Sequence, residues 1–138
     1  MTLMVRFRTR NGRYCVPVDH TLEVRLADAI MPLPMPAPGI AGILERDGAA
    51  LPVVDAFGGG SSHVLLVEAD ESPVGVLVEE VTGVVDIPER EFGPPPPGQE
   101  DTLVEAVICD DDGLTFVVDV AELVQWAEQR AFGEVEID

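Results

Sequence analysis

The sequence contains no lysine, so its eight basic residues are all arginine, and aromatic residues make up only 5% of the chain. With so few aromatics, the core must be built mainly from valine, leucine, isoleucine and alanine. No apolar run approaches the roughly 18–20 residues that a membrane-spanning helix requires. No charged-then-apolar leader precedes the strand-like alternation that begins at Leu3. We therefore expect a cytoplasmic protein that does not insert into a membrane.

Positive charge is scarce and concentrated near the start of the chain. The formal net charge is −18, yet residues 1–25 carry five arginines against two acids. A chain this acidic is not expected to bind nucleic acid, because lysine and arginine supply most of the affinity for phosphates. We expect Arg6 and Arg8 to be solvated or paired with the chain's own acids. The acidity serves either solubility or a partner with a basic face.

Groups of residues able to catalyse a reaction or bind a metal are also lacking. Cys15 and Cys109 each lie in an apolar run, which predicts two unpaired, buried thiols. His20 and His63 are far apart and belong to no nucleophile motif. The acids of Asp110–Gly113 are contiguous, which fits a tight turn better than a calcium loop. The sequence therefore predicts no enzyme, no cofactor and no metal site.

Short alternating segments predict a chain made mostly of strands. Asn11-Gly12 is a strong hairpin signal between the segments Leu3–Thr9 and Tyr14–Val18. The segment Leu22–Ile30 fits a third strand, although Leu22, Leu26 and Ile30 are spaced as in a helix. Seven further strands are predicted at Ile40–Glu45, Ala49–Val54, Val64–Glu68, Val74–Val78, Val81–Ile87, Leu103–Cys109 and Leu114–Val118.

Two proline-rich crossings and one helix complete the expected pattern. The crossings are Pro32–Pro38 and Pro94–Pro97, where regular backbone hydrogen bonding is impossible. The helix is predicted over Val120–Arg130, with Asp119 as its N-cap and Glu122 at the capping-box position. Regularly spaced short strands of this kind predict an all-β barrel or sandwich. The two halves share the order of hairpins followed by a proline crossing.

Several short motifs in order resemble the CheW-like adaptor family of bacterial chemotaxis. The first group runs without a gap from Tyr14 to Asp55, and the second lies in the other half of the chain. The motifs are Tyr14-Cys15-Val16-Pro17-Val18, Leu22-Glu23-Val24, the Pro32–Pro38 crossing, Gly42–Gly48, Pro52–Asp55, Gly75–Val84 and Val117–Leu123.

The resemblance implies an all-β fold of two small five-stranded SH3-like β-barrel lobes packed on a shared core, with one C-terminal helix. It treats residues 1–138 as one domain with approximate lobes 1–62 and 63–138 and possible strand exchange between them. It also implies a non-catalytic adaptor without cofactors. Its expected partners are the regulatory domain of a CheA-like histidine kinase and the cytoplasmic tip of a chemoreceptor, which would place the protein at receptor arrays.

The resemblance also predicts a receptor-side surface. Glu23 is the strongest interaction candidate. For one of its two apolar neighbours, Leu22 and Val24, packing in the core is an equally good explanation. Gly48 is expected to be a structural turn residue with positive φ. An arginine of the family's turn aligns with Asp47, which favours a second hypothesis of a structural or decoy module without ordinary receptor coupling. A small-ligand barrel is a third. The predicted surface comprises Leu22, Glu23, Val24, Glu45, Arg46 and Asp47.

Overall fold

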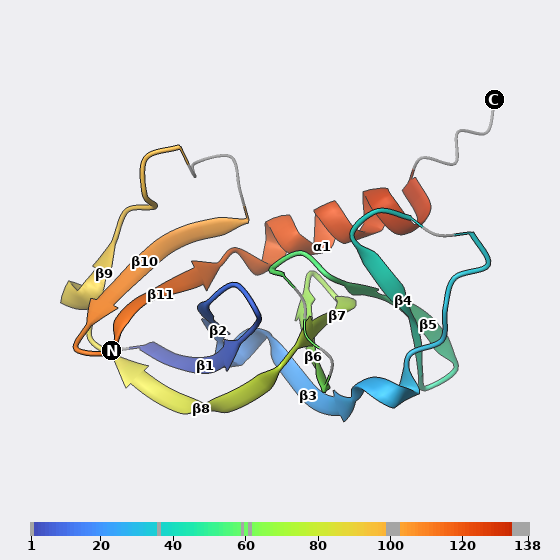
Figure 1. The fold of residues 1–138 in the computed structure, drawn as a ribbon, viewed down its shortest axis with the longest axis horizontal. Coiled ribbons are helices and arrows are strands. Elements are labelled where there is room, and N and C mark those ends of the chain that lie inside the picture. Colours follow the sequence, from blue (N-terminus) through green and yellow to red (C-terminus); the bar gives the residue numbers. More distant parts are fainter. Residues whose placement is uncertain (1, 36, 59, 61, 99–102, 134–138) are drawn as a thin grey trace.

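The computed structural model describes residues 2–35, 37–58, 60, 62–98 and 103–133. Within these residues, eleven strands form two sheets, and one α-helix, α1 (Val120–Glu128), packs against the second of them (Figure 1). The first sheet has the order β8-β1-β2-β11-β10-β9 and the second has the order β3-β6-β7-β5-β4. We call the two sheets with their enclosed side chains the first and second lobes.

The strands of the first lobe are β1 (Thr2–Arg8), β2 (Arg13–Pro17), β8 (Glu80–Ile87), β9 (Phe92–Gly93), β10 (Val104–Asp110) and β11 (Gly113–Val118). Those of the second lobe are β3 (Thr21–Leu26), β4 (Ile40–Arg46), β5 (Ala49–Val54), β6 (His63–Ala69) and β7 (Ser72–Val78).

The two lobes have the same pairing pattern but take their strands from both halves of the chain. In each, a hairpin (β1–β2 or β6–β7) pairs antiparallel with a single strand from the other half (β8 or β3). The same hairpin pairs in parallel with the last strand of a second hairpin, through β2·β11 or β7·β5. Along the chain, the first lobe therefore takes β1, β2 and β8 to β11, and the second takes β3 to β7, so neither lobe coincides with the segment 1–62 or 63–138.

Each sheet curls, and the segment after its single strand reaches the opposite edge. In the second lobe, Met31 and Ile43 exchange two backbone hydrogen bonds of 2.8 Å, which join the segment after β3 to β4. In the first lobe, the chain passes from β8 to β9, which pairs with β10. These connections give the lobes their barrel-like form, so the expected all-β fold is confirmed.

Three hydrophobic clusters hold the lobes together, one inside each lobe and one shared between them. The shared cluster draws on both sheets and on α1, for example through Phe7, Leu65 and Leu123. The cluster inside the first lobe contains Met4, Cys15, Ile87, Ile108 and Val117, and that inside the second contains Leu44, Leu51, Val53, Val64 and Leu66.

Because each sheet has a cluster on both faces, simple alternation predicts burial poorly. Met4 is 1% exposed, although it alternates with Arg6 and Arg8 along one face of β1. Leu3, which alternates with Val5 and Phe7 along the other face, is 53% exposed. Cys15 is buried as expected, but the prediction for Cys109 is wrong: its thiol is exposed, because the side chain lies on the face of β10 that no cluster covers.

Three element boundaries also differ from expectation. The third predicted strand ends at Leu26, and a 3-10 turn covers Ala27–Ala29. The short strand β9 was not predicted. The α-helix ends at Glu128, and a π-helical turn continues over Gln129–Gly133. Asp119 caps the helix as predicted, since its Oδ1 accepts a 3.1 Å hydrogen bond from the backbone N–H of Glu122. No helix among the described residues is long and apolar enough to cross a membrane.

Candidate protein-binding site

The β4–β5 hairpin turns through two residues, Asp47 and Gly48. Arg46 lies opposite Ala49, so only these two residues form the loop. Their φ angles are 52° and 84°, the left-handed pair that a type I′ turn requires. The Gly48 backbone N–H donates a 2.7 Å hydrogen bond to Oε2 of Glu45. Gly48 therefore has positive φ, as expected of a structural turn residue.

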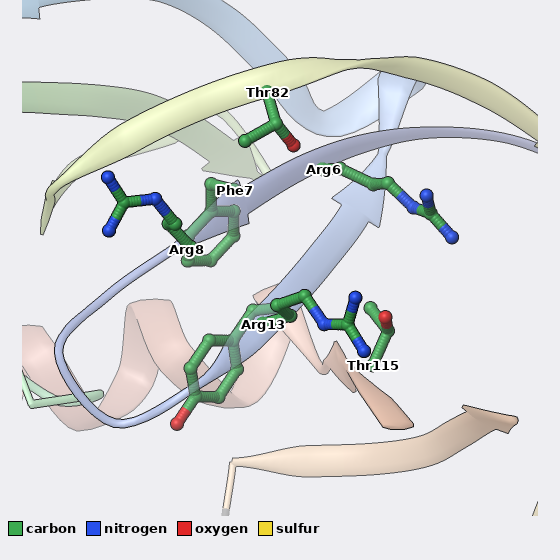
Figure 2. Close-up of a pocket in the computed structure, with 7 residues that line it drawn as sticks. Arg6, Phe7, Arg8, Arg13, Thr82 and Thr115 are labelled. Carbon is green, nitrogen blue, oxygen red and sulfur yellow. The ribbon is translucent and has the colours of Figure 1, made fainter. Parts of the chain in front are cut away.

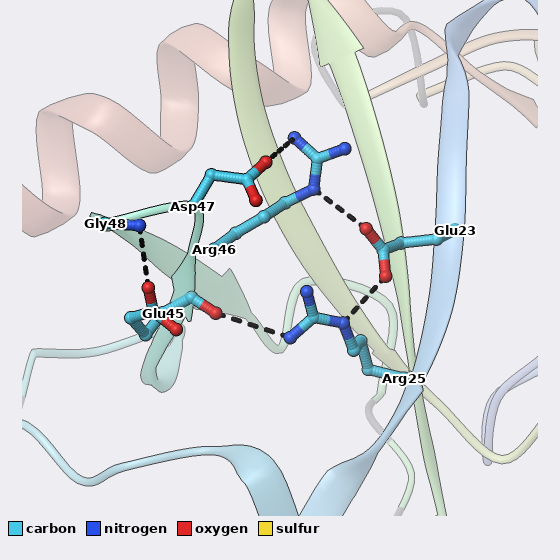
Figure 3. A network of polar contacts seen from close by, with 6 residues as sticks. All are labelled: Glu23, Arg25, Glu45, Arg46, Asp47 and Gly48. Carbon is cyan, nitrogen blue, oxygen red and sulfur yellow. Dashed lines mark hydrogen bonds and ion pairs between the residues drawn. The ribbon is translucent and has the colours of Figure 1, made fainter.

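A charged network joins this turn to the neighbouring edge strand β3 (Figure 3). Glu23 accepts a 2.7 Å hydrogen bond from Nε of Arg25 and a 2.8 Å hydrogen bond from Nε of Arg46. Arg25 also donates to the main-chain oxygen of Glu45 at 3.3 Å. The carboxylate of Asp47 lies 3.9 Å from Nη1 of Arg46. One carboxylate thus holds two guanidinium groups from two strands.

The network keeps its members charged. Hydrogen bonds from Arg25 and Arg46 lower the pKa of Glu23, and the hydrogen bond to Glu23 raises the pKa of Arg46. All three side chains remain partly exposed to solvent, where single ion pairs contribute little to stability. The main effect of the network is therefore on orientation. It holds Arg46 back against β3, while Asp47 keeps a side chain that is 88% exposed and turns its carboxylate toward the Arg46 guanidinium (Figure 3).

The predicted site residues do not form one surface. The pairing of β3 with β6 slips by one residue between Thr21 and Glu23, which is a β-bulge at Leu22. Leu22 packs against the cluster inside the second lobe. Glu23 points toward the turn, whereas Val24 lies on the opposite face of the strand and is 45% exposed. The charged residues and Val24 are therefore two adjacent parts of the β3 edge.

Exposed apolar side chains that the sequence analysis missed extend the Val24 part. Leu26, two residues further on the same face of β3, is 60% exposed. On β8, the edge strand of the first lobe, Val84 is also 60% exposed. Val24 lies opposite Leu65 and Val84 lies opposite Val5, and both partners belong to the shared cluster. The shared core is thus continued toward solvent on both edge strands. Figure 1 shows these strands, β8 and β3, along the lower side of the molecule.

We call Val24, Leu26, Leu3 and Val84 the open edge of the shared core. Leu3 is included because it follows the same face of β1 as Val5. Sequence alternation marks all four as candidates for burial. Only the order of strands in the two sheets shows that Val24, Leu26 and Val84 lie on edge strands and that Leu3 lies on the strand next to β8.

Arg6 and Arg8 on β1 are paired with the chain's own acids, as expected. Nη2 of Arg6 lies 2.7 Å from Oδ2 of Asp110, and Nε of Arg8 lies 3.0 Å from Oε1 of Glu80. Asp110 also accepts a 2.9 Å hydrogen bond from the N–H of Asp112, which stabilises a turn. No group of three or more His, Cys, Asp or Glu side chains in the described part of the chain is placed to hold a metal ion.

Two curled sheets on a shared core, with one helix packed against the second sheet, define a two-lobed all-β fold. The chain belongs to the CheW-like domain family, whose model matches residues 3–128. This confirms the resemblance seen in the sequence motifs.

Known relatives agree with this family. The chain is 30% identical over 138 aligned residues to protein FrzA of Myxococcus xanthus, covering 91% of this chain and 86% of that protein. It is 28% identical over 102 residues to the chemotaxis protein CheW of Rhizobium meliloti, covering 67% of this chain and 66% of that protein. The crystal structure of the scaffolding protein TtCheW from Thermoanaerobacter tengcongensis superposes with a TM-score of 0.75 at 27% identity, covering 85% of this chain and 88% of that one. The protein is thus a CheW-like scaffold of the chemotaxis type.

Proposed function

We propose that this protein is a non-catalytic adaptor that couples the cytoplasmic tip of a chemoreceptor to the regulatory domain of a CheA-like histidine kinase. The observation that carries the proposal is the open edge of the shared core in a chain of the CheW-like family. Such an edge presents apolar area flanked by charged groups, the usual composition of a protein interface with a polar rim.

The receptor occupies the β3 side of the molecule. Val24 and Leu26 supply apolar contact, and the network of Glu23 and Arg46 lies on the other face of the same strand. Apolar side chains buried at the centre of an interface contribute most of the affinity, while charges at its rim decide between partners. The exposed carboxylate of Asp47 disfavours an acidic receptor patch and favours a basic one.

A second candidate function follows from the same turn. Arg46 is the only arginine in the turn, and its guanidinium is held by Glu23 rather than directed outward. A module with no projecting arginine at this position keeps the fold and the kinase partner but binds an ordinary acidic receptor tip poorly.

Titration calorimetry with two purified partners tests the proposal. The partners are the regulatory domain of a CheA-like kinase from the same organism and a receptor held in nanodiscs. Leu26→Glu should abolish receptor binding and leave the melting temperature nearly unchanged, because the side chain is 60% exposed. Leu114→Glu, at a 49% exposed apolar position on β11, is the matched control and should bind like the wild type.

The outcomes separate the candidates. Binding of both partners supports the adaptor, and binding of the kinase domain alone supports the second candidate. Binding of neither partner contradicts the proposed function.

A further inference from the structure

A cavity at the end of the first lobe is lined by three of the chain's eight arginines (Figure 2). Its volume is about 200 Å³, and it lies where β1, β2, β8 and β11 come together. No acidic residue lines it, although the chain contains 26 acids. The lining residues are Arg6, Phe7, Arg8, Arg13, Tyr14, Thr82 and Thr115.

Arg6 and Arg13 bring their guanidinium groups toward Thr115 at one end of the cavity, whereas Arg8 points to the other end (Figure 2). Arg6 binds Asp110 through Nη2, and its Nε is buried without a hydrogen-bond acceptor among the described residues. Arg13 donates to the main-chain oxygen of Asp112, and it lies close enough to Asp110 for its charge to act on that carboxylate, although the two form no salt bridge within the described residues. Both guanidinium groups therefore keep N–H donors that their own contacts do not use.

We propose that this cavity binds one small oxyanion, a carboxylate or phosphate group, between Arg6 and Arg13. Guanidinium groups offer paired donors that match the oxygens of either anion. The hydroxyl of Thr115, a residue only 2% exposed, lies beside them as a further polar group. Phe7 and Tyr14, whose rings stack with centroids 5.6 Å apart, form an apolar wall that suits the short carbon stem of a carboxylate.

The size of the cavity limits the ligand. Sites for drug-sized ligands and cofactors usually measure about 300–1,000 Å³, so this one suits a group of a few heavy atoms. The anion is either a free small molecule or the end of an acidic side chain presented by a bound protein. This inference does not depend on the proposed function, because it concerns a different lobe and needs no partner to be tested.

Thermal unfolding at constant ionic strength tests it, with inorganic phosphate and glutarate as separate probes and sodium chloride as the reference. A ligand that binds only the folded state raises the melting temperature as its concentration increases. We expect at least one probe to raise it beyond chloride for the wild type and for Arg90→Gln, an exposed arginine outside the cavity. Arg13→Gln removes one positive charge, as Arg90→Gln does, but it should weaken the affinity for the active probe by about tenfold.

Arg13 also packs against the β10–β11 turn, since its Nη2 is only 2.7 Å from where a Cβ on Gly113 would lie. Arg13→Gln could therefore disturb folding, so a second measurement is made on the wild-type protein. In wild-type NMR spectra, the amides of Thr82 and Thr115 should shift on titration with the active probe, while that of Gly48 should not. A response to phosphate alone assigns a phosphate ligand, and a response to glutarate assigns a carboxylate. If neither probe exceeds chloride, or Arg13→Gln and Arg90→Gln respond equally, the cavity is not an anion site.

Discussion

Glu23 on β3 and Arg46 at the end of β4 are joined by a 2.8 Å hydrogen bond across the end of the second lobe. The two strands are the outer strands of their sheet, so this contact links its two edges. It also fixes which charge of the β4–β5 turn is more exposed, because Glu23 holds Arg46 while the side chain of Asp47 is 88% exposed. The electrostatics of the turn follow from this pair, and the proposed partner preference rests on it.

The Glu23 network predicts a pH-dependent contribution to stability. The pKa of Glu23 is lowered in the folded state, so its ionised form stabilises the fold above its unfolded pKa of about 4.3. This contribution disappears as the pH falls through the lowered folded-state pKa. Urea unfolding should show Glu23→Gln less stable than the wild type at pH 7 and equally stable near pH 2.

Glu128→Gln is the control for that experiment, because it removes one negative charge from an exposed position on α1. If Glu23→Gln and the wild type differ by the same amount at every pH, the hydrogen bonds to Arg25 and Arg46 do not form in solution.

The type I′ turn predicts a specific cost for replacing Gly48. A Cβ there would meet no atom within 4 Å, so any effect comes from its φ of 84° alone. Gly48→Ala should destabilise the protein by about 1–2 kcal/mol, the cost of an ordinary residue in the left-handed region. Gly12→Ala, where φ is not positive, should change the free energy of unfolding much less. Equal effects in denaturant unfolding would contradict the turn geometry.

Asp47 should control partner choice more than stability. Asp47→Asn keeps a residue type that tolerates the left-handed conformation and removes the exposed charge. The free energy of unfolding should change by less than about 0.5 kcal/mol. Affinity for an acidic receptor tip should rise, and Asp47→Arg should raise it further despite a larger stability cost. Unchanged receptor affinity in both variants, measured by calorimetry, would show that the turn lies outside the interface.

The two thiols should behave differently. Burial raises the pKa of Cys15 to about 12, and its side chain is fully buried. Cys109 is exposed, so a thiol reagent at pH 8 should modify one thiol in the native protein and two after denaturation. Cys109→Ser should remove the fast reaction. Modification of both thiols at equal rates would place Cys15 outside the core of the first lobe.

Local features of this fold could be predicted from the sequence, but the exchange of strands could not. Asp47-Gly48 marked the β4–β5 turn and Asp119 marked the start of α1, because each acts on its own backbone. Asn11-Gly12 lies in its expected hairpin, although neither residue has the positive φ of a type I′ turn. The parallel pairing of β2 with β11 joins residues about a hundred positions apart and leaves no local pattern. The position of α1 likewise depends on a contact between distant residues, Trp126 on the helix and Gly39 at the end of the first proline crossing. Gly39 has a φ of 83°, and a Cβ there would lie 2.6 Å from the ring of Trp126.

The candidate site shows the same division. The residues of the turn were predicted, whereas the bulge that turns Leu22 inward and the exposure of Leu26 and Val84 were not. Their exposure depends on which strands end each sheet, and this is a property of the whole topology. Cys109 was wrongly predicted to be buried for the same reason. Its neighbour Ile108 faces the cluster inside the first lobe, whereas the side chain of Cys109 points to the other face of β10.

Reconstituted kinase assays test the adaptor function most directly. The CheA-like kinase, its receptor in nanodiscs and this protein are combined, and phosphate transfer is measured with each component left out in turn. If the protein is the adaptor, receptor control of the kinase appears only when it is present, is lost with Leu26→Glu, and is kept with Leu114→Glu. Receptor control that is the same with and without the protein, or that survives Leu26→Glu and is lost with Leu114→Glu, would contradict the adaptor function.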